Sequence, residues 1–122
     1  MKIAIPVDDK NMKSNVCVSF GRAPYFMFYD TEKQNSNFVN NSAANSRGGA
    51  GIKAAQIIVD NNADVLITPR CGENAADVLK AAYITIYKSK DNSIEENLRN
   101  LKEEKLNLLT EIHSGFHGHG VK

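Results

Sequence analysis

Residues 64–87 read DVLITPRCGENAADVLKAAYITIY, and the succession of strand-forming and helix-forming residues in this stretch decides the fold. The β-branched run at 64–68 predicts a strand, the pattern at 73–82 predicts a helix, and residues 84–87 predict a second strand. Strand, helix and strand joined by short links form a βαβ unit, in which the two strands are parallel. The loop at 69–72 should then emerge at the carboxyl end of the first of these strands.

The pattern of apolar residues predicts further elements on both sides of this unit. Upstream, the expected strands are residues 3–7, 25–29 and 37–40, and the expected helix is residues 52–62. Downstream, Ser93 should cap a helix because Glu96 follows three residues later, and the leucines up to Leu109 predict one or two closing helices.

This order of elements predicts one α/β domain over residues 1–110, followed by a flexible tail rich in glycine and histidine at 111–122. A meander of three strands followed by right-handed crossovers gives a mixed five-stranded sheet of order 3-2-1-4-5. Its second strand is antiparallel, and helices cover both faces. Open sheets of this kind bind ligands at the carboxyl ends of their strands, so the site is expected where the loops after strands one, three and four meet.

Composition and charge exclude several classes of protein. The chain has 122 residues, enough for one ordinary domain, and its 15 basic and 14 acidic residues give a formal net charge of +1. A nearly neutral chain is not expected to bind nucleic acid, and no apolar run approaches the ~20 residues of a membrane span or forms a signal-peptide core. The expected location is the cytoplasm, where Cys17 and Cys71 would be thiols rather than a disulfide.

The three loops at the expected edge carry the unusual side chains. They contain both cysteines together with Arg22, Arg47 and Arg70, which are three of the four arginines. Two helix N-termini would offer backbone N–H groups there, and guanidinium groups would add positive charge. A cysteine just before a helix, as Cys71 is predicted to be, should have a lowered pKa. These features indicate a negatively charged ligand that contains a soft metal.

Three motifs also carry a resemblance to a known family. They are residues 20–26 (FGRAPYF), residues 49–55 (GAGIKAA), and residues 71–75 (CGENA) followed by LKAA at 79–82. In this order, and from Met1 to about Leu109, they resemble the dinitrogenase iron-molybdenum cofactor biosynthesis family. The resemblance implies a ribonuclease H-like fold and proteins that hold or transfer iron–molybdenum or related metal–sulfide clusters. Two positions depart from the family pattern: Ser19 stands where many relatives have histidine, and Glu73 where they often have proline.

The expected function is therefore to bind, carry or scaffold an anionic iron/molybdenum-type metal–sulfur cluster, without catalysis, for an unknown client or donor protein. Cys71 and Cys17 are the expected metal ligands. The expected binding residues are Cys17, Ser19, Arg22, Arg47, Gly49, Gly51, Arg70, Cys71, Gly72 and Asn74.

Other functions stay open on the sequence alone. A non-catalytic regulatory or interaction module that has lost the cluster would account for Ser19. A metal-dependent nuclease would need a tight group of carboxylates, for which Asp8 and Asp9 are the first candidates. A nucleotide-binding enzyme would use the G-x-G-x-x-A pattern at residues 49–54, although that pattern lacks the tight turn from a preceding strand.

The histidines form a second candidate metal site. All three, His113, His117 and His119, lie in the glycine-rich tail, where imidazoles on a flexible backbone can reach one divalent ion. The alternative is a disordered end that binds metal only opportunistically.

Overall fold

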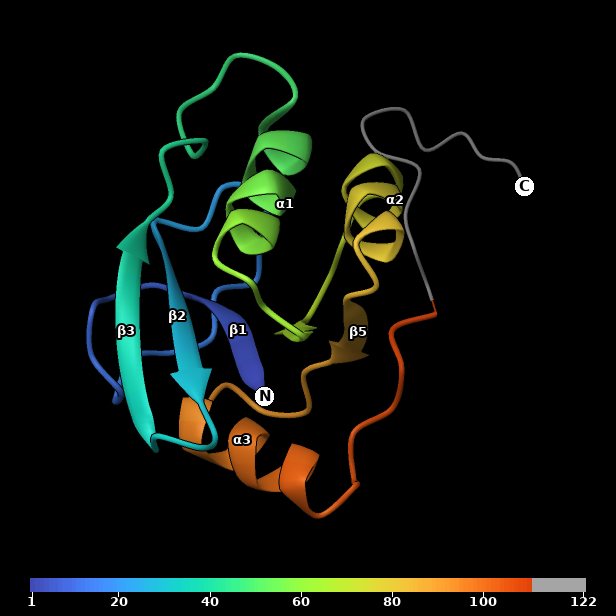
Figure 1. Ribbon diagram of the computed structural model, residues 1–122. Helices are drawn as coiled ribbons and strands as arrows, with labels where there is room; N and C mark the ends of the chain where they lie inside the picture. The colour runs from blue at the N-terminus through green and yellow to red at the C-terminus, as the bar shows by residue number, and fades with distance from the viewer. Residues whose placement is uncertain (111–122) are drawn as a thin grey trace.

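The computed structural model describes residues 1–110, in which strands and helices alternate after an initial three-stranded meander (Figure 1). The strands are β1 (Lys2–Val7), β2 (Tyr25–Asp30), β3 (Asn35–Asn40), β4 (Val65–Thr68) and β5 (Thr85–Lys88). The helices are α1 (Ala50–Asp60), α2 (Glu73–Ala81) and α3 (Ile94–Lys102). None of these helices is long and apolar enough to cross a membrane.

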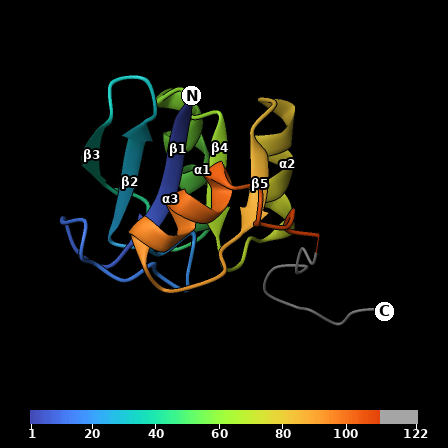
Figure 2. The ribbon, with the colours of Figure 1, turned by 90° about the horizontal axis from the view of Figure 1, so that it is seen from below.

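The strands form one mixed sheet of order β3-β2-β1-β4-β5, as predicted. β2 is antiparallel to both of its neighbours, whereas β1 pairs in parallel with β4 and β4 in parallel with β5. Figure 2 shows the strands side by side in this order, with β3 and β5 at the two ends. The carboxyl ends of β1, β4 and β5 therefore lie at one edge of the sheet.

Helices cover both faces of the sheet, which gives two layers of core. α1 and α2 pack side by side on one face and α3 lies on the other (Figures 1 and 2). Side chains alternate between these layers along each strand: Phe26 and Phe28 belong to the α1–α2 side, and Met27 between them to the α3 side. Each such large buried side chain contributes roughly 1.5–3 kcal/mol to stability.

The closing segment is partly as predicted. The Ser93 side chain accepts a hydrogen bond from the Glu96 amide at 3.1 Å and begins α3. Of the one or two closing helices expected, the described residues form one, α3; residues 106–109 run extended along β5 instead, and the Leu109 amide donates to the Ile86 carbonyl at 2.9 Å. Leu106 and Leu109 are buried in opposite layers, which suits an extended chain, where residues three apart face opposite sides.

A close backbone contact fixes the loop after β1 against the start of α1. A Cβ atom at Gly21 would lie 3.1 Å from both Cα and N of Gly51. The Asn41 side-chain amide holds the same loop by donating to the carbonyls of Gly21 at 3.0 Å and Ala23 at 2.8 Å. Glycine at position 21 thus lets two of the three predicted site loops meet.

This contact predicts that Gly21→Ala destabilises the fold, because the added methyl group must push backbone atoms apart. We expect the free energy of unfolding, measured by urea denaturation, to fall by about 1–3 kcal/mol. Gly48→Ala is the matched control, since a Cβ there meets no atom within 4 Å, and it should change stability by less than about 0.5 kcal/mol. Equal effects of the two substitutions would contradict the contact.

Candidate functional site

A hollow of about 460 Å³ lies where three segments distant in sequence meet: the loop after β1, the start of α1, and the connection from β4 to α2. This is the sheet edge expected from the sequence. The predicted binding residues that line it are Ser19, Arg22, Gly49, Gly51, Arg70, Cys71, Gly72 and Asn74. Cys17 and Arg47 do not line it.

Two helix N-termini open into this hollow. α1 begins after Gly49 and α2 after Gly72, and neither helix has a side chain that caps its first turn. The first N–H groups of a helix have no partner within the helix, and the helix dipole places positive potential there. The first-turn residues of both helices line the hollow: Ala50, Gly51, Ile52, Glu73, Asn74 and Ala75. Such backbone amides bind anions without any charged side chain.

Two glycines shape the start of α1. Gly49 has a φ of 68°, a left-handed conformation that favours glycine. A Cβ at Gly51 would already be in van der Waals contact with the Ala75 methyl group, at 3.5 Å. Glycine at position 51 leaves room between the two helix starts.

Cys71 is one of the residues that line the hollow, although only 1% of it is exposed and it belongs to the core on the α1–α2 side. Its Sγ lies 3.6 Å from the Gly72 carbonyl oxygen. Burial raises the pKa of Cys71 from its ordinary value to about 11, and the positive charge of Lys80 opposes this only in part. The lowered pKa expected from sequence was therefore wrong, because loss of solvation outweighs the favourable potential at the helix start.

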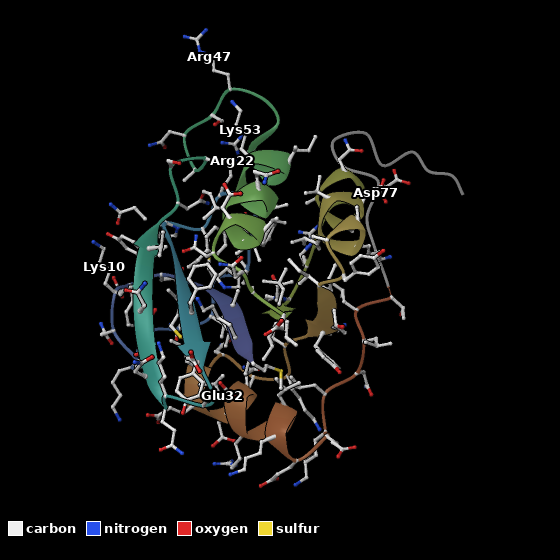
Figure 3. All side chains as sticks on the ribbon, viewed as in Figure 1. Lys10, Arg22, Glu32, Arg47, Lys53 and Asp77 are labelled. Atoms are coloured by element: carbon white, nitrogen blue, oxygen red, sulfur yellow. The ribbon has the colours of Figure 1, made fainter. Side chains whose placement is uncertain are left out.

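The three arginines have different surroundings. Arg70 lines the hollow. Arg22 lines it too, but its Nη1 donates to the carbonyls of Ala44 at 2.9 Å and Ser46 at 3.1 Å, so it also braces the loop before α1. Arg47 lies at the tip of that loop and extends away from the rest of the molecule (Figure 3). Arg47 therefore adds positive charge to this end of the molecule, but its side chain does not line the hollow.

Cys17 and Ser19 both lie in the loop after β1 and form hydrogen bonds that stabilise it. The Cys17 amide donates to the Pro6 carbonyl at 2.8 Å, and its side chain is buried in the α1–α2 layer. Burial raises the pKa of the Cys17 thiol, and the nearby Asp8 carboxylate adds to this. Ser19 lines the hollow, and its hydroxyl accepts a hydrogen bond from the Arg22 amide at 3.2 Å. The serine therefore stabilises the turn that carries Arg22.

The protein ligands available to a metal are few. Both cysteines are free thiols, and within residues 1–110 no group of three or more histidine, cysteine, aspartate or glutamate side chains is placed to hold a metal ion. The predicted tail ligands, His113, His117 and His119, lie outside the described residues. A metal centre in the hollow would thus find at most the Cys71 thiolate and the Glu73 carboxylate among these residues and would need its other ligands from elsewhere.

Sequence reasoning missed the apolar rim of the hollow. Val18 and Ile52 both line it, with 69% and 43% of their surfaces exposed. Val18 stands two residues before the FGRAPYF motif, and Ile52 lies within the GAGIKAA motif. Nothing in a single sequence marks such residues as exposed, because β-branched apolar side chains are usually assigned to the core.

Comparison with known proteins identifies relatives of this chain in sequence and in fold. An uncharacterized protein of Methanocaldococcus jannaschii is 31% identical over 109 residues, which cover 87% of this chain and 89% of the relative. The apo form of the orange protein from Desulfovibrio gigas superposes with a TM-score of 0.85 at 25% identity, covering 89% of this chain and 92% of that one. A NifB-like protein from Thermotoga gives 0.81 at 34% identity, covering 94% and 98%. The model of the dinitrogenase iron-molybdenum cofactor family matches residues 1–104, and the chain therefore belongs to this family.

Proposed function

We propose that this protein binds an anionic iron/molybdenum-type metal–sulfur cluster in the hollow and carries or scaffolds it for a client or donor protein. One observation carries the proposal: two uncapped helix N-termini open into one hollow that Cys71 also lines. Family membership supports a role related to such cofactors. The assignment of the sheet to the ribonuclease H-like fold belongs to the same proposal.

In this proposal the parts of the site have separate roles. The first-turn amides of α1 and α2, together with Arg22 and Arg70, balance the negative charge of the cluster. Cys71 loses its proton and offers one thiolate. Cys17 lies outside the hollow, so its proposed role as a second ligand has less support than that of Cys71. The proposed role of Arg47 has less support than those of Arg22 and Arg70 for the same reason.

A site with one available thiol suits a cargo rather than a resident cofactor. Because residues 1–110 offer no set of three metal-binding side chains, the cluster must bring most of its own sulfide ligands. Charge and backbone amides then hold it as a whole anion, and few bonds need to break on release. We propose that this role is non-catalytic. We also propose that the protein acts in the cytoplasm, because two free thiols are kept reduced there.

Two observations favour a second candidate function, a regulatory or interaction module that has lost the cluster. Glu73 lines the hollow and brings a negative charge to the start of α2, where it competes with an anion. Ser19 offers a hydroxyl to the Arg22 amide and no imidazole to a metal. By contrast, the metal-dependent nuclease gains no support from the described residues, which contain no suitable group of carboxylates.

Anaerobic reconstitution with iron, molybdate and sulfide tests the proposal and the role of each thiol. We expect the wild-type protein to acquire a visible absorbance band and bound metal. Cys71→Ser should bind the cluster at least about tenfold more weakly, since one ligand bond is lost. Cys17→Ser is the matched control and should stay within about threefold of wild type, because Cys17 does not line the hollow. Absorbance and metal analysis after gel filtration measure how much cluster each variant binds relative to wild type.

The pH dependence of loading provides the control for thiolate binding. With a Cys71 pKa of about 11 in the empty site, binding must displace one proton. As the pH increases towards that value, the affinity of the wild-type protein for the cluster should increase about tenfold per pH unit. This slope should disappear in Cys71→Ser. No bound chromophore in wild type, or equal loading and equal slopes in both proteins, would rule out the thiolate model.

We further propose that His113, His117 and His119, beyond the described residues, bind a divalent metal ion. Truncation after Ile112 should lower the affinity for Zn²⁺ or Ni²⁺ by about tenfold or more, measured by isothermal titration calorimetry on the cluster-free protein. Removal of residues 120–122 alone is the matched control and should leave the affinity unchanged. If both truncations bind as wild type does, the tail histidines hold no specific metal.

A further inference from the structure

The two edge strands of the sheet, β5 and β3, differ in whether another segment of the chain pairs with their outer side. Residues 106–109 run along the outer side of β5, where the Lys88 amide donates to the Asn107 carbonyl at 2.8 Å and the Leu109 amide to the Ile86 carbonyl at 2.9 Å. β3 forms the opposite edge, and in the described part of the chain its only strand neighbour is β2 (Figure 2). One edge is thus covered by the chain itself and the other is open.

β3 lacks the features that usually protect an open edge. Natural edge strands are blunted by charged side chains, proline or a bulge. The sequence of β3, NSNFVN, contains no charge and no proline, and all its residues pair with β2 in unbroken register from Asn35↔Asp30 to Asn40↔Tyr25. It therefore presents a regular, uncharged row of backbone groups to a further strand.

The direction of these groups follows from the register. The Asn41 amide donates to the Pro24 carbonyl on the β2 side at 3.0 Å. Backbone groups alternate in direction along a strand. The amides and carbonyls of Ser36, Phe38 and Asn40 therefore point outward, away from β2.

We propose that two copies of this chain pair through β3, antiparallel and about a two-fold axis at Phe38. In this register Ser36 of one copy faces Asn40 of the other, and Phe38 faces its own counterpart. The outward groups of both strands then satisfy one another, and opposed side chains lie on the same face of the joined sheet. Since β5 is already covered, the pairing closes as a dimer rather than extending into a fibre.

A second copy fits this edge better than a strand of another protein. The register is self-complementary: β3 itself carries no charge that would repel its own image, and half-buried Phe38 forms an aromatic cross-strand pair. A pair of short strands buries little surface, so the dimer is weak and forms at high protein concentration. The hollow lies at the strand ends rather than along β3, so this inference is independent of the cluster.

Sedimentation equilibrium of the full chain, from micromolar to millimolar concentration at low salt, tests the dimer. Two double variants at exposed positions test the register. In Ser36→Glu/Asn40→Glu, like charges face each other twice, and the dissociation constant should rise on the order of fivefold or more. In Ser36→Glu/Asn40→Lys, opposite charges face each other twice, and the dissociation constant should fall on the order of fivefold.

Both variants place their changes on solvent-exposed side chains, and circular dichroism should show the wild-type fold for each. A wild-type chain that stays monomeric at millimolar concentration would overturn the proposal and leave the edge to a strand of another protein. Equal dissociation constants for the two double variants would overturn it as well, because only pairing of position 36 with position 40 separates them.

Discussion

The parallel pairing of β1 with β4 is the constraint on which the candidate site depends. Ile3 pairs with Val65 and Ala4 with Leu66, so the two strands end at the same edge of the sheet. A parallel pair requires a crossover, and α1 supplies it by starting at that edge and returning to the other. The loop after β1, the start of α1 and the loop before α2 therefore meet. An antiparallel β4 would have placed Cys71 at the opposite edge.

Two physical effects oppose each other in the hollow. The open helix starts and the arginines favour negative charge, yet burial keeps the Cys71 thiol protonated when no metal is present. The thiolate, which is the form that binds a metal, is therefore scarce in the empty site. A metal–sulfur anion would be attracted by the amides first and would gain the thiolate only by displacing the proton.

The sheet order could be predicted because strand lengths and connections leave few choices. The apolar run at 64–68, the helix after it and the strand at 84–87 require a parallel pair, and the aromatic run at 25–29 requires a hairpin with the polar strand that follows. Convergence of the loops follows from topology alone. For that reason Ser19, Gly49 and Cys71 were placed together correctly without any contact being known.

What the sequence could not predict depends on packing. Cys17 precedes the FGR motif closely enough to suggest a ligand, but its side chain turns into the core. Arg47 belongs to the right loop, but nothing in the pattern says that the tip of this loop points outward. The pKa of Cys71 depends on how completely neighbouring groups exclude water. Leucine spacing at 106–109 suits a helix as well as an extended segment, and only β5 beside it selects the latter.

The most direct test of the central claim is to locate the cluster by amide NMR of the ¹⁵N-labelled full chain, before and after anaerobic reconstitution with iron, molybdate and sulfide. If the two helix starts hold the anion, the amide signals of Gly51, Ile52, Asn74 and Ala75 should shift or broaden most. The account would be contradicted if these signals stayed unchanged in the loaded protein while those around another hollow of the molecule, beside Tyr29, Leu98 and Leu101, moved instead.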